Sequence, residues 1–438
     1  MIRSFLTVST GTLASRLLGF VRDSMIAALL GTGAVADAFL LAFQLINVVR
    51  RLLTEGALNA ALIPAWLRLR DSKSETAAAA FAGKVLATIS TVLIGATALI
   101  GLLMPFVLTV LAPGFADNET LQLAVADARL MLPYIAFAGP STVMLALYSA
   151  QSRFALTAFS PLLFNITLIV VMIALIVSGK TAGFVTLTLA ATIGIAGLLQ
   201  LLVLVSQRRS SRIATPLRVS FDAEMRRFLA RAVPGMLANS APQLLMVGGA
   251  IIASSTPSAV SWLYFANRLI ELPLGIVSVA MGTVLIGELT RSLRDGEEAA
   301  SAQAHAVELV AGLTLPATFG LIVLSDPIVR LLFEHGAFTA QDTGATAQVL
   351  VWLALALPAN ALSKALSPSF FAREDTITPL KAGIIGFAVA ITTALVFNHL
   401  FGARGIAAGI ALGAWSSAVL LARSGAATLG LLLPRPTR

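Results

Sequence analysis

SRLLGFVRD (residues 15–23) opens a charged hydrophobic region that continues through GTGAVAD (31–37) and AFLLAFQLINVVRRLLTEGALNAALIPAW (38–66). Its two apolar segments are long enough to cross a membrane, yet they carry Arg16, Arg22, Asp23, Asp37, Arg50, Arg51 and Glu55. A charge at the centre of a bilayer costs at least about 2.5–3.5 kcal/mol on insertion scales. We therefore expect these side chains to face a cavity or one another instead of lipid.

The composition is that of an integral membrane protein. Of the 438 residues, 58% are hydrophobic and only 12% are charged, whereas a soluble domain typically carries about 25% charged residues. Apolar runs of roughly 20 residues recur along the chain, which favours transmembrane helices over the ~10-residue alternation of barrel strands. We predict an all-α polytopic membrane protein with no separate soluble domain.

The charge balance and the absence of cysteine exclude several classes of function. The chain has 30 Lys and Arg against 21 Asp and Glu, and in a membrane protein such an excess usually lies in cytoplasmic loops. We therefore expect the lipid bilayer, and no nucleic acid, as a partner. No cysteine is present, which excludes disulfides, thiol catalysis and thiolate metal sites. Arg16 interrupts the first apolar run before a small-residue cleavage site, so we expect a retained helix, not a signal peptide.

Hydropathy predicts twelve transmembrane helices, with Gly, Pro and charge clusters at their boundaries. They span 4–30, 34–66, 78–111, 122–150, 156–178, 182–206, 225–253, 258–290, 302–333, 342–371, 377–398 and 403–432. The basic segment 207–224 is interpreted as a cytoplasmic linker between an N-terminal six-helix lobe (1–206) and a C-terminal six-helix lobe (225–438). Lys and Arg gather in alternate loops, so the positive-inside rule predicts that both termini are cytoplasmic.

Weak internal similarity relates the two halves. AFQL (42–45) aligns with ANRL (266–269), and PGFA (113–116) aligns with HGAFTA (335–340) at nearly the same offset, about 220 residues. Six helices per unit preserve orientation, so the sequence predicts two parallel pseudo-repeats. Transporters of this kind bind substrate between the halves, which here predicts a central cationic cavity.

The charges within the predicted helices fall on stripes. Arg16 and Asp23 are two turns apart on one face of the first helix, and the second helix presents Asp37, Gln44 and Arg51 at the same seven-residue step. The eighth helix repeats the design more sparingly, with Asn267, Arg268, Glu271 and Glu288. The membrane charges are therefore concentrated on three helices.

Arginine is the preferred cation at the deep positions. Its guanidinium group forms planar bidentate bonds to phosphate and keeps its proton. We predict an anion site for phosphate or pyrophosphate, with substrate-binding residues Arg16, Arg22, Arg50 and Arg268 and with Asp23, Asp37, Arg51, Glu55 and Glu271 in gating or charge balance. The alternative is that these arginines pair with the acidic residues only to fix helix packing.

Other polar residues give weaker signals. His305, His335 and His399 lack metal-ligand spacing and are expected at the surface. No HExxH, GxSxG, P-loop or paired-carboxylate pattern is present, so we expect neither an enzyme nor a cofactor. Polar residues of the seventh and eleventh helices either coordinate a coupling cation or form interhelical hydrogen bonds, namely Asn239, Ser240, Gln243, Thr392 and Thr393. The residues leave open whether Na⁺, H⁺ or the membrane potential drives the protein.

A family resemblance covers essentially the whole chain. SRLLGFVRD, ADAFLLAF, RRLLTEGALNAALIP, APGF, SWLYFANRLIELPLG, LFEHGAFTAQD and SPSFFAREDTITPLK resemble the MurJ/MviN family of lipid II flippases, part of the multidrug/oligosaccharidyl-lipid/polysaccharide exporter superfamily. Departures are Gln44-Leu45-Ile46, where the family often has Lys-x-Pro, and Asn267, where Asp commonly precedes the arginine. Relatives also commonly have a further helix pair after the position where this sequence ends.

The resemblance implies a function in peptidoglycan biosynthesis at the bacterial cytoplasmic (inner) membrane. The headgroup of an undecaprenyl-pyrophosphate-linked disaccharide-pentapeptide would cross a cationic cavity by alternating access, and cell-wall synthesis proteins would be partners. The family's cavity arginines fall on Arg16, Arg22, Arg50 and Arg268, and its important early aspartate falls on Asp37. Alternatives are a flippase for another polyprenyl-linked glycan, a drug/cation antiporter, or a non-transporting scaffold for cell-wall assembly.

Overall fold

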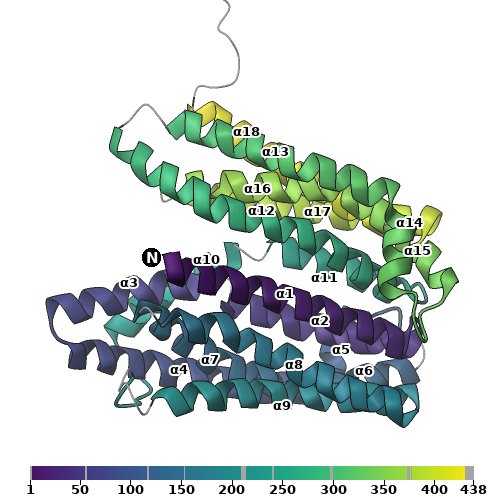
Figure 1. The fold of residues 1–438 in the computed structure, drawn as a ribbon, viewed down its shortest axis with the longest axis horizontal. Coiled ribbons are helices and arrows are strands. Elements are labelled where there is room, and N and C mark those ends of the chain that lie inside the picture. Colours follow the sequence, from purple (N-terminus) through teal and green to yellow (C-terminus); the bar gives the residue numbers. More distant parts are fainter. Residues whose placement is uncertain are drawn as a thin grey trace, which may run out of the picture. The chain divides into compact units, whose positions relative to one another are not determined.

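The computed structural model describes residues 2–54, 57–115, 118–151, 153–208, 214–238, 241–295, 299–371, 375 and 377–429. Within these ranges the chain forms eighteen α-helices and no strand (Figure 1). The first ten are α1 (Ile2–Leu30), α2 (Ala34–Thr54), α3 (Ala57–Ser72), α4 (Glu75–Leu102), α5 (Met104–Leu111), α6 (Asn118–Met131), α7 (Pro133–Ala150), α8 (Phe154–Ser178), α9 (Ala182–Arg208) and α10 (Ala223–Ala238). The remainder are α11 (Ala241–Ala253), α12 (Ala259–Asp295), α13 (Ala299–Val323), α14 (Ser325–Phe333), α15 (Ala340–Ala354), α16 (Ala356–Phe371), α17 (Ile377–Phe401) and α18 (Ala403–Leu429).

Each of the twelve predicted spans coincides with one helix or with two consecutive helices. The single helices are α1, α8, α9, α12, α17 and α18, and the pairs are α2/α3, α4/α5, α6/α7, α10/α11, α13/α14 and α15/α16. In both halves of the chain the third and fourth spans are pairs and the fifth and sixth are unbroken. This pattern agrees with the predicted repeat. By length and composition, 8 helical stretches of the described chain qualify as membrane-spanning, so twelve crossings stay a prediction.

Proline divides two of the predicted spans into two helices each. α5 begins after Leu103 with Pro105 in its first turn, and α7 begins at Pro133. Proline has no N–H to donate and clashes with the preceding turn, so it is tolerated best where a helix starts. The predicted spans 78–111 and 122–150 therefore each contain two helices, the second of which starts at or just before a proline.

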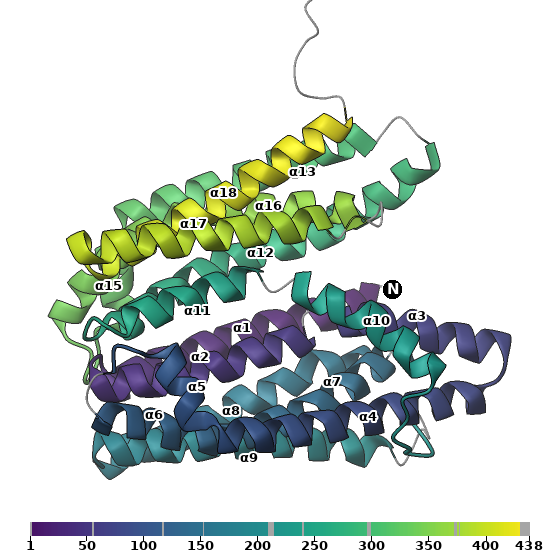
Figure 2. The same cartoon turned by 180° about the vertical axis from the view of Figure 1, so that it is seen from behind.

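The helices form two compact units. Unit 1 comprises residues 1–240 with the short segment His335–Phe338, and unit 2 comprises residues 241–334 and 339–438. Within unit 1, α1 packs on α8, α2 on α6 and α4 on α7; within unit 2, α17 packs on α18, α12 on α15 and α13 on α16 (Figures 1 and 2). α10 follows the predicted linker but lies in unit 1, where it packs on α3.

The described part of the predicted linker is bound to α4. The backbone N–H of Thr215 donates to Ala79 O (3.2 Å), and Thr88 exchanges two hydrogen bonds with the Ser220 backbone (3.2 and 3.1 Å). Lys84 Nζ lies 2.7 Å from Asp222 Oδ2, and Asp222 Oδ1 accepts from Met225 N (2.9 Å) in the first turn of α10. These contacts fix where α10 starts relative to α4.

The segment His335–Phe338 packs on the end of α1 within unit 1. Ala337 N donates to Ala28 O (2.8 Å), and Gly31 and Gly336 approach the opposing backbone so closely that a Cβ at either would meet a carbonyl oxygen. Both glycines have positive φ, 61° and 59°, a conformation that other L-residues adopt at a cost. Glycine is therefore required twice in this contact.

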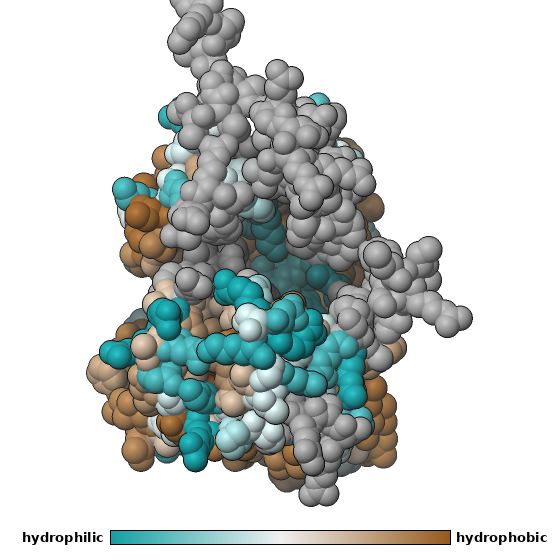
Figure 3. All heavy atoms as spheres, turned by 90° about the vertical axis from the view of Figure 1, so that its left-hand side faces the viewer, coloured by the Kyte–Doolittle hydropathy of each residue, from teal (hydrophilic) through white to brown (hydrophobic). Residues whose placement is uncertain are grey.

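Large apolar side chains cover the flanks of the helices. Leu102, Phe106, Val177, Phe319 and Leu400 are all exposed, and such surfaces are expected where helices meet lipid. Figure 3 looks onto the end of unit 1 that carries the α3–α4 turn, where hydrophilic side chains gather. The exposed cations of this end include Arg68, Arg70, Lys73 and Arg218. The chain is thus a multi-pass membrane protein with basic loops.

Candidate functional site

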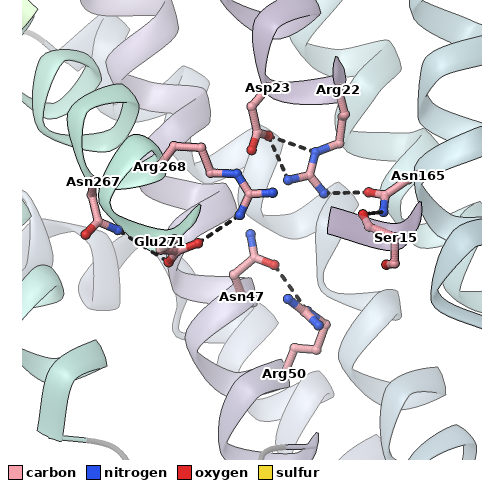
Figure 4. A network of polar contacts seen from close by, with 9 residues as sticks. All are labelled: Ser15, Arg22, Asp23, Asn47, Arg50, Asn165, Asn267, Arg268 and Glu271. Atoms are coloured by element: carbon pink, nitrogen blue, oxygen red, sulfur yellow. Dashed lines mark hydrogen bonds and ion pairs between the residues drawn. The ribbon is translucent and has the colours of Figure 1, made fainter. Parts of the chain in front are cut away.

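The best-defined polar cluster of unit 1 centres on Arg22 of α1 (Figure 4). Its Nε and Nη2 donate to Asp23 Oδ1 at 2.8 and 2.7 Å, and its Nη1 donates to Asn165 Oδ1 at 3.0 Å. Asn165 Nδ2 in turn donates to the backbone oxygen of Ser15 (3.2 Å). Arg22 is 8% exposed and Asp23 0%. The guanidinium group therefore joins α1 to α8 in addition to pairing with its neighbour.

Aromatic rings surround this guanidinium group. Arg22 Cζ lies 5.1 Å from the centre of the Phe43 ring and 5.9 Å from that of Phe164. A cation over the face of an aromatic ring is attracted by the ring quadrupole. The buried Tyr134 of α7, whose ring centre is 5.1 Å from that of Phe164, interacts electrostatically with both Arg50 and Arg22. Helices α1, α2, α7 and α8 all contribute to the surroundings of Arg22.

The second helix carries the other predicted charges of unit 1. Arg50 Nε donates to Asn47 Oδ1 at 3.3 Å, one turn earlier on α2, and both Arg50 and Arg51 are half-buried. Asp37 is buried in the first turn of α2, where a carboxylate is favoured by the positive end of the helix dipole. Arg16 of α1 is also half-buried. All four have further polar or electrostatic interactions.

The predicted site residues of unit 2 lie together on α12. Arg268 Nη1 lies 2.8 Å from Glu271 Oε2, and Asn267 Nδ2 donates to Glu271 Oε1 at 3.4 Å (Figure 4). Residues three and four apart on a helix are neighbours, so this cluster needs no second helix to form it. The side chains of Arg268 and Glu271 are 19% and 22% exposed. Arg268 is thus more accessible than Arg22, and its counter-ion Glu271 lies on the same helix.

These arrangements suit anion binding more than covalent chemistry. An arginine held by an amide and a carboxylate keeps a fixed orientation, and its remaining donors match phosphate geometry. The described residues contain no group of three His, Cys, Asp or Glu side chains able to hold a metal ion. What each cluster offers is an oriented, permanently charged guanidinium group.

The remaining predicted residues are placed as follows. Glu55, Asn239 and Ser240 lie outside the described residues, as do the side chains of Glu288 and His305. His335 and His399 are exposed, as predicted. Thr393 donates to Val389 O within α17 (2.6 Å), and Thr392 is exposed. Thr393 therefore bonds within its own helix in this conformation.

Sequence reasoning named Asp23 but missed the other partners of Arg22. Asn165 is an isolated amide in the strongly apolar stretch LLFNITLIV, and an unaccompanied polar side chain in a membrane helix is a signal that it has an interhelical partner. Phe43 and Phe164 carry no such signal, because phenylalanine is common throughout apolar helices.

The fold matches that of solved membrane transporters. The chain matches a solved structure of "Lipid II flippase MurJ, inward closed conformation" with TM-score 0.81 and 24% identity, over 96% of this chain and 87% of that one. It also matches an inward-facing multidrug resistance MATE family transporter of the MOP superfamily with TM-score 0.78 and 16% identity, over 95% and 94% of the two chains. The fold is therefore that shared by MurJ and MATE transporters.

Sequence comparison narrows this class to one family. The family model described as "Lipid II flippase MurJ" matches residues 26–431. Proteins named probable lipid II flippase MurJ from Rhizobium tropici and Rhizobium meliloti (strain 1021) are 37% and 38% identical to this chain, each over 96% of it and 80% of the relative. The Burkholderia cenocepacia lipid II flippase MurJ is 30% identical over 96% of this chain and 83% of its own. The chain belongs to the MurJ lipid II flippase family.

Proposed function

We propose that this protein is a lipid II flippase. It moves the undecaprenyl-pyrophosphate-linked peptidoglycan precursor from the inner to the outer leaflet of the bacterial cytoplasmic membrane by alternating access. The observation that carries the proposal is the match of the MurJ family model over residues 26–431, together with oriented, partly buried arginines on α1, α2 and α12. Transport without covalent change of the lipid makes the protein a transporter, not an enzyme.

The arginines have the chemistry that this substrate needs. The pyrophosphate of the lipid carries the negative charge, and guanidinium groups bind phosphate oxygens in bidentate geometry without losing their proton. We assign substrate binding to Arg16, Arg22, Arg50 and Arg268. Asp23, Asp37, Arg51, Glu55 and Glu271 act in gating or charge balance, because the carboxylates among them compete with an anionic substrate for the nearby guanidinium groups.

The topology follows from the basic loops. Exposed Arg68, Arg70, Lys73 and Arg218 lie on the loop set that the positive-inside rule assigns to the cytoplasm. We propose cytoplasmic termini and an N-terminal lobe of residues 1–206 joined to a C-terminal lobe of residues 225–438 by the linker 207–224. The enzymes that make and use the lipid are the protein partners that this function implies.

Depletion in cells tests the proposal. Cells that carry this chain as their sole flippase are depleted of it, and lipid II accessible at the outer face is measured after add-back of wild type or of Arg268→Gln. We expect depletion to trap lipid II inside and only wild type to release it. If the amount of lipid II at the outer face stays unchanged after depletion, lipid II is not the substrate of this protein.

The similarity to MATE transporters supplies the competing candidate, a drug/cation antiporter of the same fold. Ion flux in vesicles that contain the purified protein separates the two. Stimulation by the lipid-linked substrate supports the flippase, and stimulation by cationic drugs alone would support the antiporter.

A further inference from the structure

Asp127 of α6 is a buried carboxyl group outside the site described above. It lies in the stretch Glu119–Ala150, which is long and apolar enough to cross a membrane. The residue is 0% exposed, and neither carboxyl oxygen has a hydrogen-bond partner. It shares one face of α6 with the buried side chains of Ala124, Ala128 and Met131. An acidic group therefore occupies a buried, mainly apolar helix face within a stretch that qualifies as membrane-spanning.

No described charge compensates this carboxyl group. The helices packed on α6 are α2, α5, α7 and α9. The titratable or charged residues with described side chains are Asp37, Arg50 and Arg51 on α2, Tyr134 and Tyr148 on α7, none on α5 or α9, and Glu119 and Arg129 on α6 itself. None of them pairs with either Asp127 oxygen, and Arg129 Nε instead donates to Gly101 O at 3.0 Å.

The hydroxyl group of Thr186, a polar neighbour of Asp127, is engaged with the backbone of its own helix. Thr186 of α9 lies beside the carboxyl group and is 0% exposed. Its hydroxyl already donates to the backbone oxygen of Gly183 at 3.0 Å, so only the lone pairs of Oγ1 remain for Asp127. An ionised carboxylate accepts hydrogen bonds and donates none. While the Thr186 hydroxyl donates to Gly183 O, Thr186 Oγ1 and an ionised Asp127 are two acceptors without a hydrogen between them, and a proton on the carboxyl group supplies that hydrogen.

We propose that Asp127 and Thr186 form a proton-binding site that is occupied in this conformation. The neutral carboxyl group donates its O–H to Thr186 Oγ1, which removes the clash of acceptors and the cost of an unpaired buried charge. The bound proton stabilises the packing of α6 on α9. Release of the proton leaves a carboxylate that this packing cannot accommodate, so the proton is exchanged when the contact between these helices loosens.

The site supplies the flippase with a coupling ion. Substrate transport requires unit 1 to change conformation, and a proton taken up in one conformation and released in another links that change to the proton gradient. This step rests on the proposed function. The proton site itself is testable without substrate.

Infrared spectroscopy of the purified full-length protein tests the site directly. The difference spectrum of wild type minus Asp127→Asn is expected to show the stretch of a protonated carboxyl group at neutral pH. That band should disappear as pH rises, because the ratio of neutral to ionised carboxyl changes about tenfold per pH unit. Absence of the band at neutral pH, or a band that no pH change removes, would overturn the proposal.

Thermal unfolding gives a second readout. The midpoint of wild type should fall as pH rises through the range in which the band disappears, because ionisation opposes the α6–α9 packing. Asp127→Asn, which is permanently neutral, should remove that dependence, whereas Glu119→Gln, a change at an exposed carboxylate of the same helix, should keep it. If the unfolding midpoint depends on pH equally in wild type and Asp127→Asn, Asp127 is not the proton-binding group.

Transport in vesicles tests the coupling. Wild-type transport of lipid II should depend on an imposed pH gradient, and Asp127→Asn should lose that dependence. Identical gradient dependence in the two proteins would overturn the coupling role. Wild type that moves no lipid II while its infrared band titrates would contradict the proposed function instead, so the two failures are distinguishable.

Discussion

Arg22 Nη1 and Asn165 Oδ1 lie 3.0 Å apart and join α1 to α8 by a hydrogen bond within the apolar part of unit 1. The amide is held in turn by its own donation to Ser15 O. A hydrogen bond to a charged group contributes about 1.5–3 kcal/mol. The position of the Arg22 guanidinium group therefore depends on α8 as well as on Asp23.

The variant Asn165→Leu should both lower the stability of unit 1 and lower the rate of transport. The variant removes the acceptor of Arg22 and the donor to Ser15, and its unfolding midpoint should fall by several degrees. Thr167→Val on the same helix is the matched control, because the Thr167 hydroxyl donates only to Leu163 O one turn earlier. Equal midpoints for the two variants would contradict the bridging role of Asn165.

Charge exchange at Arg268 and Glu271 separates substrate binding from helix packing. Arg268→Gln should lower transport by about 10- to 100-fold, the loss expected from one charge-assisted hydrogen bond. The double variant Arg268→Glu with Glu271→Arg can restore the ion pair, since the two residues are i,i+3 neighbours. It should match wild type in protein abundance without recovering transport. Restored transport would show that the pair serves only packing.

The Asp222 carboxylate should make linker binding dependent on pH. The hydrogen bond from Lys84, followed by that from the Met225 backbone N–H, holds the pKa of Asp222 well below its ordinary value. A lowered pKa stabilises the folded contact above the ordinary value of about 3.9, and this stabilisation is lost as pH falls through the lowered pKa. Asp222→Asn should therefore speed hydrogen exchange of residues 214–222 at neutral pH.

Wild type and Asp222→Asn should reach the same hydrogen-exchange rate for residues 214–222 as the medium becomes strongly acidic. Asp71→Asn is the control, because this exposed carboxylate pairs only with the adjacent Arg70 among the described ion pairs. If Asp222→Asn leaves this exchange rate unchanged at neutral pH, the backbone hydrogen bonds of Thr215 and Ser220 are sufficient to hold the linker on α4.

Gly336→Ala should release the segment His335–Phe338 from α1. The new Cβ would meet Ala28 O and would also occupy a positive φ of 59°. Gly402 has nearly the same φ, 58°, and a Cβ added there would have no neighbouring atom within 4 Å. Gly402→Ala therefore incurs the backbone cost of about 1–2 kcal/mol without the collision. Amide exchange at Ala337 should accelerate in the first variant and stay slow in the second.

Hydropathy predicted the helical segments because every span in lipid must be apolar and must satisfy its backbone hydrogen bonds internally, which a helix does. Each predicted span coincides with helix, and Arg22, Asp23 and Asp37 are buried as their insertion cost demands. The sequence does not show that new helices start after Leu103 and at Pro133, because a proline within an apolar run is compatible with both a kink and a new helix start.

Contacts between distant segments could not be predicted from periodicity. The docking of residues 335–338 on α1 depends on close backbone approach, which the glycines permit but do not specify. α10 belongs to unit 1 because its residues Met225, Phe228 and Ala232 pack in the apolar core of that unit, and the Lys84–Asp222 pair, whose members are 138 residues apart, adds a polar contact. Asp127 needed its neighbours for interpretation, because the two acidic residues of NETLQLAVADARLM, Glu119 and Asp127, are equally typical of a helix that faces water.

The most direct test of the central claim is lipid II translocation in vesicles that contain only lipids, lipid II and the purified protein. The account predicts that wild type exposes lipid II at the opposite leaflet, that Arg268→Gln reconstitutes equally well but is slowed by about 10-fold or more, and that Arg330→Gln, a change at an exposed cation of unit 2, behaves as wild type. Equal rates for wild type and Arg268→Gln would contradict the assignment of the arginines to the lipid pyrophosphate.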